Sequence, residues 1–569
     1  MYWDNKIWIG DADGEKVFIR PEMANRHGLI TGATGTGKTV TLKVLAESFS
    51  EAGVPVFLAD IKGDLSGMCR PGENSMDLQE RIQKFALLDH GFSTCSYPTA
   101  FWDVFGKSGI PLRTTISEMG PLLLAKLMDL NETQTDVLTV VFKIADDQEL
   151  LLIDTKDLKS MLQYVGEHNK EFAVSYGNVS KQSIGAIVRG VVALEAQGAE
   201  QFFGEPAFHI ADWFAGGLDG RGMINVLDCR ELACSADMYS TFLLWMLSEL
   251  FEELPEIGDT DKPRMVFFFD EAHLLFQDIS KVLREKIEQV VRLIRSKGVS
   301  VWFISQSPGD IPDTVLGQLG NKIQHALRAY TPSDAKKVKA AADSLRANPA
   351  FDTREAIESL GTGEALVSAL DESGIPEMVK RCRILPPRSL MGAIAEEEKQ
   401  QETLKNNLYL KYRSMEDRDS AYEFLMRKSR QDQQEAALAA EQERMRKEQA
   451  REEERLAKEQ AREEERLAKE QAREEERLAR EQARAAEKLA REQAREQERL
   501  AKEREQEAQK WEKTVKSSIS KAANTAGGTL GREIGNTVGK GLGGSFGKRL
   551  GGNVGASLGR SILGNLLKL

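Results

Sequence analysis

Short apolar runs rich in β-branched and aromatic residues alternate with helical spacing of apolar residues from residue 1 to about 388. Six of these runs have the length and composition of buried strands: 28–31, 54–59, 223–227, 265–269, 299–304 and 325–329. Between the second and third run, residues 110–200 carry clusters with helical spacing. This alternation predicts an α/β fold, with a parallel sheet flanked by helices and a helical insertion over about 110–200.

The pattern changes after Pro386-Pro387, because proline ends regular structure. Residues 389–510 are charged and helical in pattern, and an 11-residue unit, AREEERLAKEQ and its variants, recurs through 450–504. Eleven residues make three helical turns, so one leucine per unit returns to the same face of a long helix. One leucine and two alanines per unit give the helix only a narrow apolar stripe through which to pack as a coiled coil. A solvated single helix and a weak coiled coil both remain open.

A third region, 511–569, repeats a G-x-x-Φ tetrad in which Φ is apolar. A glycine at every fourth position makes a poor helix in water, at a cost of about 1 kcal/mol each relative to alanine. Packing through a small-residue stripe, insertion into a membrane surface and a flexible tail are the three readings left open. The basic residues that follow Gly527, set against a single glutamate, would suit anionic lipid or nucleic acid.

Charge is distributed unevenly along the 569 residues, whose formal net charge is −12. Residues 1–400 hold 58 acidic and 41 basic side chains, which argues against binding of nucleic acid through bulk charge. Contact with DNA would need a local basic channel. The five cysteines show no CxxC spacing and predict neither a disulfide framework nor a zinc site. With no signal peptide and no run of 18 apolar residues, we expect a cytoplasmic protein.

Candidate chemistry begins at a complete GxxxxGKT string between the run 28–31 and a helical pattern over 40–49. A strand, a glycine-rich loop and a helix in this order predict a loop that cradles the phosphates of ATP. Lys38 would reach the β- and γ-phosphates, and the Thr39 hydroxyl would ligate Mg²⁺. The expected nucleotide-binding residues are Gly32, Ala33, Thr34, Gly35, Thr36, Gly37, Lys38 and Thr39.

Two carboxylates follow the apolar run 265–269. They supply the metal-binding carboxylate and the water-activating group that a phosphate loop alone lacks. Asp270 would hold the Mg²⁺, and Glu271 would polarise the attacking water. Gln306, which follows the run 299–304, is the candidate sensor of the γ-phosphate, with a simple turn residue as the alternative. Asp60 and Lys62 follow the run 54–59, and either line the nucleotide site or cap the next segment.

These strings resemble the HerA–FtsK superfamily of motor ATPases, in its HerA-like bacterial branch. The resemblance rests on HGLITGATGTGKT, VPVFLADIKGDLSG, MVFFFDEAH, VRLIRSKGVSVWFISQSP and LGNKIQHALRAYT, and it covers about 5 to 388. It implies a RecA-like P-loop NTPase fold and a homohexameric ring that couples ATP hydrolysis to movement along duplex DNA. It also implies that an arginine of the neighbouring subunit completes each site. Arg295 lies in the matching segment and Arg328 is a second candidate, while a place on a helix surface remains the alternative for both.

Two functions from different classes remain in view. The first is a Mg²⁺-dependent ATP-hydrolysing ring motor, a translocase or helicase-like enzyme that acts on DNA. The second is a nucleotide-switched assembly protein, tethered to a membrane or a protein partner by the charged helix and the glycine-rich tail. The acidic charge of residues 1–400 favours the second, and the motif set favours the first.

Overall fold

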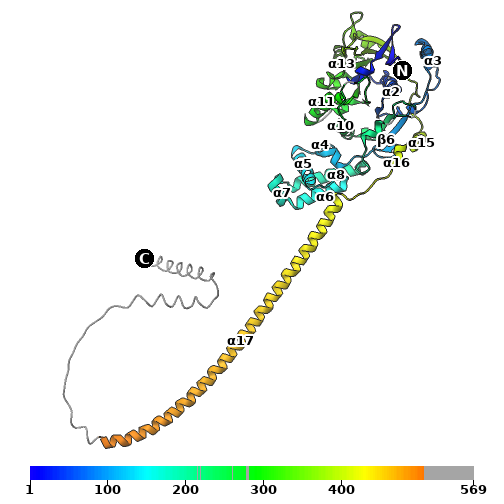
Figure 1. Cartoon of the computed structure of the whole chain (residues 1–569). Helices are drawn as coiled ribbons and strands as arrows, with labels where there is room; N and C mark the ends of the chain where they lie inside the picture. Colours follow the sequence, from blue (N-terminus) through cyan, green and yellow to red (C-terminus); the bar gives the residue numbers. More distant parts are fainter. Residues whose placement is uncertain (215, 218, 259, 277–280, 505–569) are drawn as a thin grey trace, which may run out of the picture. The chain divides into compact units, whose positions relative to one another are not determined.

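A single mixed sheet organises the chain in the computed structural model, which describes residues 1–214, 216–217, 219–258, 260–276 and 281–504 (Figure 1). Within these residues the sheet has 13 strands, in the order β1-β2-β13-β12-β11-β4-β10-β9-β5-β8-β6-β7, with β3 paired to β2. The predicted α/β class is therefore confirmed.

Eight neighbouring strands are parallel and form the centre of the sheet. They are β11 (Asn321–His325), β4 (Gly28–Thr31), β10 (Val299–Ser305), β9 (Met265–Phe269), β5 (Val56–Asp60), β8 (Ile224–Asp228), β6 (Thr99–Asp103) and β7 (Ile110–Pro111). Antiparallel strands continue the sheet beyond β11: β12 (Glu364–Ser368), β13 (Lys380–Ile384), β2 (Lys6–Ala12), β1 (Tyr2–Trp3) and β3 (Glu15–Ile19).

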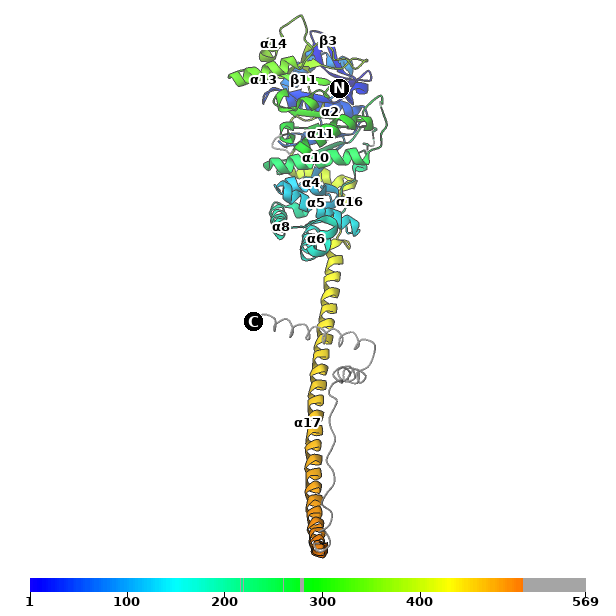
Figure 2. The ribbon, with the colours of Figure 1, turned by 90° about the vertical axis from the view of Figure 1, so that its left-hand side faces the viewer.

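Both faces of the central strands are buried, which explains their continuous apolar runs. In β9, Phe267 and Phe269 enter one core, whereas Val266 and Phe268 enter the other. This is the two-residue alternation of a strand. The first core holds α4 (Ile116–Leu127), α10 (Ala236–Glu253) and α11 (Lys281–Leu293), and in Figure 2 α10 lies between α11 and α4. The second core holds α2 (Lys38–Glu51).

Helices fill the range where the sequence predicts an insertion. After α4 these are α5 (Glu132–Asp147), α6 (Thr155–Glu167), α7 (Asn169–Tyr176), α8 (Lys181–Ala196) and α9 (Ala199–Phe202). Side-chain caps fix several of their starts: Thr115, Asn131 and Asp154 each form a capping box at the first turn of α4, α5 and α6.

The prediction of a strand over 325–329 is wrong, because β11 ends at His325. In β11, Asn321 to Gln324 pair with Gly28 to Thr31 of β4. Beyond Thr31 the chain of β4 turns into a loop, so the residues after His325 lose their pairing with β4. Ala326 instead accepts a hydrogen bond from Ala33 of that loop, at 2.9 Å.

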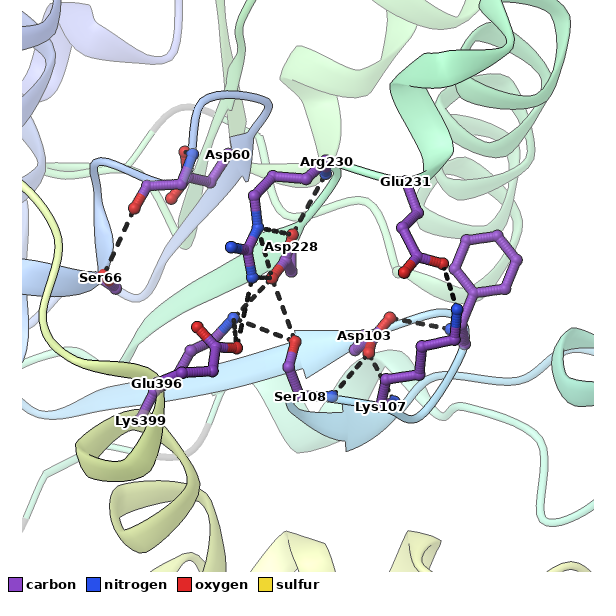
Figure 3. A network of polar contacts seen from close by, with 12 residues as sticks. Asp60, Ser66, Asp103, Lys107, Ser108, Asp228, Arg230, Glu231, Glu396 and Lys399 are labelled. Atoms are coloured by element: carbon purple, nitrogen blue, oxygen red, sulfur yellow. Dashed lines mark hydrogen bonds and ion pairs between the residues drawn. The ribbon is translucent and has the colours of Figure 1, made fainter.

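The compact unit runs from Met1 to Gln442 and so continues beyond residue 388, where the sequence predicts the end of the folded core. Two short helices, α15 (Glu396–Lys405) and α16 (Asn407–Tyr412), pack against β6 and β7. Lys399 of α15 is buried and donates to Asp228 at the end of β8, at 2.6 Å (Figure 3). Arg230 also pairs with Asp228 and reaches Glu396 at 3.3 Å. A buried ion pair thus fixes the segment after residue 388 to the sheet.

Helix α17 (Ala421–Arg504) contains the 11-residue repeats. Within the second unit, which begins at Glu443, a glutamate pairs with a lysine or arginine four residues later at five positions, 11 residues apart, four of which lie in the repeats from 450 to 493. These pairs are Glu443–Lys447, Glu454–Lys458, Glu465–Lys469, Glu476–Arg480 and Glu487–Arg491. Such pairs stabilise an isolated helix by about 0.2–0.5 kcal/mol each. The choice between a single helix and a coiled coil stays open.

The glycine-rich region 511–569 lies outside the described residues. No helix of the described part of the chain is both long enough and apolar enough to cross a membrane.

Two buried histidines make the stability of the fold depend on pH. His27 accepts from the Val301 amide and its other ring nitrogen lies 2.8 Å from the Val291 carbonyl. Burial lowers the pKa of His27 to about 4, and it lowers the pKa of His325 to about 4 as well. Between pH 6.5 and 4 both histidines are therefore protonated in the unfolded chain but stay neutral in the folded chain.

We expect the free energy of unfolding to fall by about 2 kcal/mol for each of these histidines between pH 7 and pH 5. The free energy of unfolding falls as the pH is lowered because these histidines bind protons more strongly in the unfolded state than in the folded state. Asp60 acts in the opposite sense, since burial raises its pKa to about 6. Denaturant unfolding of the wild type and of His27→Asn at both pH values measures the contribution of His27. Asparagine tolerates the positive φ of 60° at this position. An equal loss of stability in both proteins would contradict the assignment.

Candidate nucleotide-binding site

The predicted phosphate loop and the predicted acidic pair come together at the carboxyl edge of the parallel strands, whereas Arg295 does not join them. The glycine-rich loop follows β4 and leads into α2, while Asp270 follows β9. Strand β10 lies between β4 and β9, so the loop and the carboxylates are two strand spacings apart, about 10 Å. That separation leaves room for a phosphate group and a metal ion between them.

The loop 32–37 needs its glycines. Gly32, Gly35 and Gly37 have φ values of 150°, 76° and 112°, in the region that side chains disfavour. A Cβ on Gly32 would also lie 2.5 Å from the Cβ of His325. The loop is braced on its outer side, because the Gly363 amide donates to the Thr36 carbonyl at 3.1 Å. The backbone thus turns without side chains that would block its inner side.

Lys38 is the first residue of α2, and its side chain folds back across the loop. Its Nζ donates to the Gly32 carbonyl at 2.6 Å and to the Ala33 carbonyl at 3.1 Å. Burial lowers the pKa of Lys38, and the nearby Glu271 opposes this shift. The ammonium therefore lies within the loop and faces the acidic pair. Thr39 follows in the first turn of α2 and is half-buried, whereas Thr34 and Gly35 at the tip of the loop are exposed.

Asp270 and Glu271 lie side by side in a strained turn. Glu271 has φ of 47°, an uncommon value for a residue other than glycine, and its amide donates to Asp270 Oδ1 at 3.0 Å. Tyr239 of α10 donates to the Asp270 carbonyl at 2.7 Å. Burial raises the pKa of Asp270, while the charge of Lys62 counteracts the rise. The turn holds both carboxylates at the edge of the sheet.

The donor set fits a hard cation. Thr39 and Asp270 offer oxygen atoms, the ligands that Mg²⁺ prefers. Glu271 Oε2 is buried and has no hydrogen-bond partner within the described ranges, and it lies 3.4 Å from Nδ1 of His273. No group of three or more His, Cys, Asp or Glu side chains in the described part of the chain forms a metal cage. Magnesium at this place would thus need oxygens from a bound phosphate as well.

The structure decides between the two readings of the segment after β5. Asp60 caps the next segment: its carboxylate accepts from the Gly63 amide at 2.7 Å and from the Leu65 amide at 3.0 Å. Lys62, between these contacts, faces the acidic pair. Its Nζ lies 3.9 Å from Asp270 Oδ2 and 3.9 Å from Glu271 Oε1. Lys62 therefore lines the site, whereas Asp60 supports the loop that carries it.

Gln306 lies at the same edge, next to the loop. Ser305, the last residue of β10, pairs with Thr31, so Gln306 follows level with Gly32. Its side chain is exposed. This position suits contact with a terminal phosphate, and the role of sensor stays a prediction.

The two candidate arginines differ in position. Arg295 precedes β10 in the turn Ile294–Lys297, and its charge acts on His27 at the start of β4. It therefore lies at the opposite edge of the sheet from the loop of its own chain. Arg328 follows β11 and donates to the carbonyls of Glu358 and Leu360, the latter at 2.8 Å. These contacts hold the end of α14 (Thr353–Ser359).

His325 is a residue of the site that the sequence did not single out. Nε2 of His325 lies 2.8 Å from the Thr41 hydroxyl, and its Nδ1 lies 3.0 Å from the Glu364 carbonyl. The ring thereby joins α2, β11 and β12 directly behind Gly32. No motif marks it, because its role depends on the pairing of β11 with β4.

Comparison with known proteins gives one family match that covers most of the chain. The family described as "Helicase HerA-like C-terminal" matches residues 6–492. DNA double-strand break repair helicases HerA from Sulfurisphaera tokodaii and Sulfolobus acidocaldarius are each 24% identical, over 386 and 370 residues. These alignments cover 64% and 63% of this chain, and 67% and 66% of the relatives. The chain thus spans about two thirds of their length.

Solved structures that resemble this one include the bacterial conjugative coupling protein TrwBdeltaN70 and VirB4 of Thermoanaerobacter pseudethanolicus. The first is 14% identical with a TM-score of 0.44, and covers 68% of this chain and 91% of its own. The second is 17% identical with a TM-score of 0.41, and covers 67% of this chain and 96% of its own.

Proposed function

The chain belongs to the HerA-like helicase family of the HerA–FtsK superfamily, and from this premise we propose that it is a Mg²⁺-dependent ATPase motor that acts on DNA as an oligomeric ring. The relatives named above are DNA repair helicases. The family supports nucleotide hydrolysis, and the geometry of the site supports the particular residues that perform it.

The observation that carries the proposal is the meeting of the phosphate loop and the acidic pair at one edge of the sheet. Lys38 is buried within the loop and faces Glu271, and β10 keeps the two halves about 10 Å apart. Had Asp270 and Glu271 followed the other end of β9, no bound triphosphate could reach both halves.

Each residue has a distinct role in this proposal. Backbone amides of Gly32 to Thr39 and the Lys38 ammonium bind the phosphates. Thr39 and Asp270 hold the Mg²⁺, which neutralises charge on the phosphate oxygens when bound. The Glu271 carboxylate accepts a proton from the attacking water. Its Oε2 atom is buried and has no hydrogen-bond partner among the described residues. Gln306 contacts the terminal phosphate.

In an oligomeric ring, the neighbouring subunit would supply an arginine to each nucleotide site. Strand β10 separates Arg295 from the loop edge by its seven residues, a length of about 20 Å. Arg295 therefore cannot reach the phosphates of its own chain, but it can serve a neighbouring subunit across an interface. We favour a homohexamer, in which six such contacts close a ring. Arg328 is the second candidate, and it donates to two carbonyl groups of its own chain.

Stimulation of hydrolysis by DNA tests the motor. At low salt we expect duplex DNA to raise the ATPase rate of the wild type several-fold, and added salt to reverse the rise as phosphate contacts weaken. The steady-state rate with and without duplex DNA measures this effect. Bovine albumin of similar acidity and DNA-free buffer serve as controls.

An ATPase rate that is indifferent to duplex DNA would favour the second candidate, a nucleotide-switched assembly protein. The observation that supports this candidate is the 84-residue charged helix α17, which no catalytic step needs. In that case the mass of the oligomer in solution should change with a non-hydrolysable ATP analogue. A membrane or protein partner would then bind through α17 or the region after it.

A further inference from the structure

Lys62 is the one lysine besides Lys38 that the described residues place against the acidic pair. Its Nζ lies 3.9 Å from an oxygen of Asp270 and 3.9 Å from an oxygen of Glu271. The equal distances place the ammonium between the two carboxylates. Its side chain is 44% exposed, whereas those of Asp270 and Glu271 are 14% and 19% exposed. The lysine thus approaches two nearly buried acids from the solvent side.

The backbone around Lys62 is fixed from three sides. Asp60 accepts from the amides of Gly63 and Leu65. Arg230 packs against Gly63, where an added Cβ would lie 3.0 Å from its Cδ. The Ile394 amide donates to the Ser66 hydroxyl at 3.2 Å. Because the loop is held so firmly, the flexible four-carbon side chain is the part of Lys62 that can change position.

The charges of the site explain what such a change would do. Without nucleotide, two adjacent carboxylates repel each other, and a cation between them offsets the repulsion. A magnesium ion held by Asp270 would repel the ammonium of Lys62 from this place. The oxygens of a terminal phosphate would attract it at the same time. Lys38 approaches from the loop, and Lys62 approaches from the β5 side of the acidic pair.

We propose that Lys62 is a second phosphate-binding cation of this site, which neutralises Asp270 and Glu271 before nucleotide binds and binds the γ-phosphate afterwards. This inference rests on the proposed ATPase function. It distinguishes triphosphate from diphosphate, because only the triphosphate carries the group that Lys62 contacts. A surface ion pair without such a role would leave nucleotide affinity unchanged.

The variants should fold, since an ion pair at 3.9 Å with a partly exposed lysine contributes little to stability. Lys62→Met removes the charge and keeps much of the side chain, and Lys62→Arg keeps the charge. Lys143→Met is the matched control, because Lys143 pairs with Asp147 on the exposed surface of α5.

The first measurement uses Mn²⁺ alone, without nucleotide, followed by electron paramagnetic resonance. Lys62→Met should bind Mn²⁺ at least about fivefold more tightly than wild type, which is the effect of one unit charge at 4 Å in water. Lys62→Arg and Lys143→Met should match wild type. Equal Mn²⁺ affinity in Lys62→Met and wild type would overturn the first half of the proposal.

The second measurement compares the affinity for ADP with that for a non-hydrolysable ATP analogue, both with Mg²⁺. We expect Lys62→Met to weaken binding of the analogue about tenfold and to leave ADP affinity within twofold, while Lys62→Arg retains the preference. Equal changes for both nucleotides, or no change, would refute the role at the γ-phosphate. Wild-type protein that binds the analogue but does not hydrolyse ATP would instead refute the proposed function alone.

Discussion

Glu271→Gln should lower ATP turnover by at least a hundredfold and leave nucleotide affinity within about twofold. A positioned general base contributes roughly 10²–10⁴-fold to a rate, and glutamine cannot accept the proton. The substitution keeps the size and polarity of the side chain. Glu271 donates its amide to Asp270, and this backbone contact is retained in the variant. Single-turnover hydrolysis and displacement of a fluorescent nucleotide measure the two quantities separately.

The matched control is Glu195→Gln. Glu195 pairs with Lys159 on the helical insertion, at 2.7 Å, and lies away from the phosphate loop. This variant should hydrolyse ATP at the wild-type rate. Full turnover in Glu271→Gln would remove this residue from the catalytic assignment, whereas loss of nucleotide binding would show that the change disturbs the site as a whole.

Asp228→Asn should destabilise the folded unit by about 3–5 kcal/mol, because it leaves two cations without their carboxylate. Asp228 and Lys399 are 9% and 7% exposed, and Arg230 pairs with the same carboxylate (Figure 3). Burial favours the neutral form of Asp228, but the hydrogen bonds from Arg230 and Lys399 outweigh it and hold its pKa well below the ordinary value. The carboxylate is thus charged at neutral pH, and Lys399 depends on it.

Urea unfolding at pH 7 measures this loss of stability. The matched control is Glu231→Gln, since Glu231 pairs with Lys107 at a site where both side chains are more than half exposed, and its loss should leave the urea midpoint close to that of wild type. The double variant Asp228→Asn with Lys399→Met should recover part of the lost stability, because it removes one of the unpaired charges. A single variant as stable as wild type would show that water or a shifted side chain compensates for the lost carboxylate.

The local pattern of the sequence was enough to predict the strands that carry the site. The predicted ranges 28–31 and 265–269 match β4 and β9, since strands buried on both faces read as continuous apolar runs. The strands β12 and β13 were missed. Their residues alternate between polar and apolar, as in Lys380–Ile384. Whether such a short segment forms a strand depends on packing against the neighbouring strands.

The residues that support the site show the same division. Motifs predict Lys38, Thr39, Asp270 and Glu271 as site residues, because phosphate and metal chemistry restricts both residue type and spacing. The proximity of Lys62 to the acidic pair and the place of His325 behind Gly32 could not be found in this way. Each depends on which strands are neighbours, and residues far apart in the chain meet only when the sheet forms.

By itself, then, the sequence determined an α/β protein with a phosphate loop, an acidic pair and a repetitive charged helix, because each of these is written in local spacing. Only the tertiary structure decided that β10 separates the loop from the acidic pair, that Arg295 lies at the far edge, and that Lys399 ties the segment after residue 388 to Asp228. The physical reason is that strand order and burial arise from packing between segments far apart in the chain. The spacing of residues within one segment does not determine which other segments it packs against.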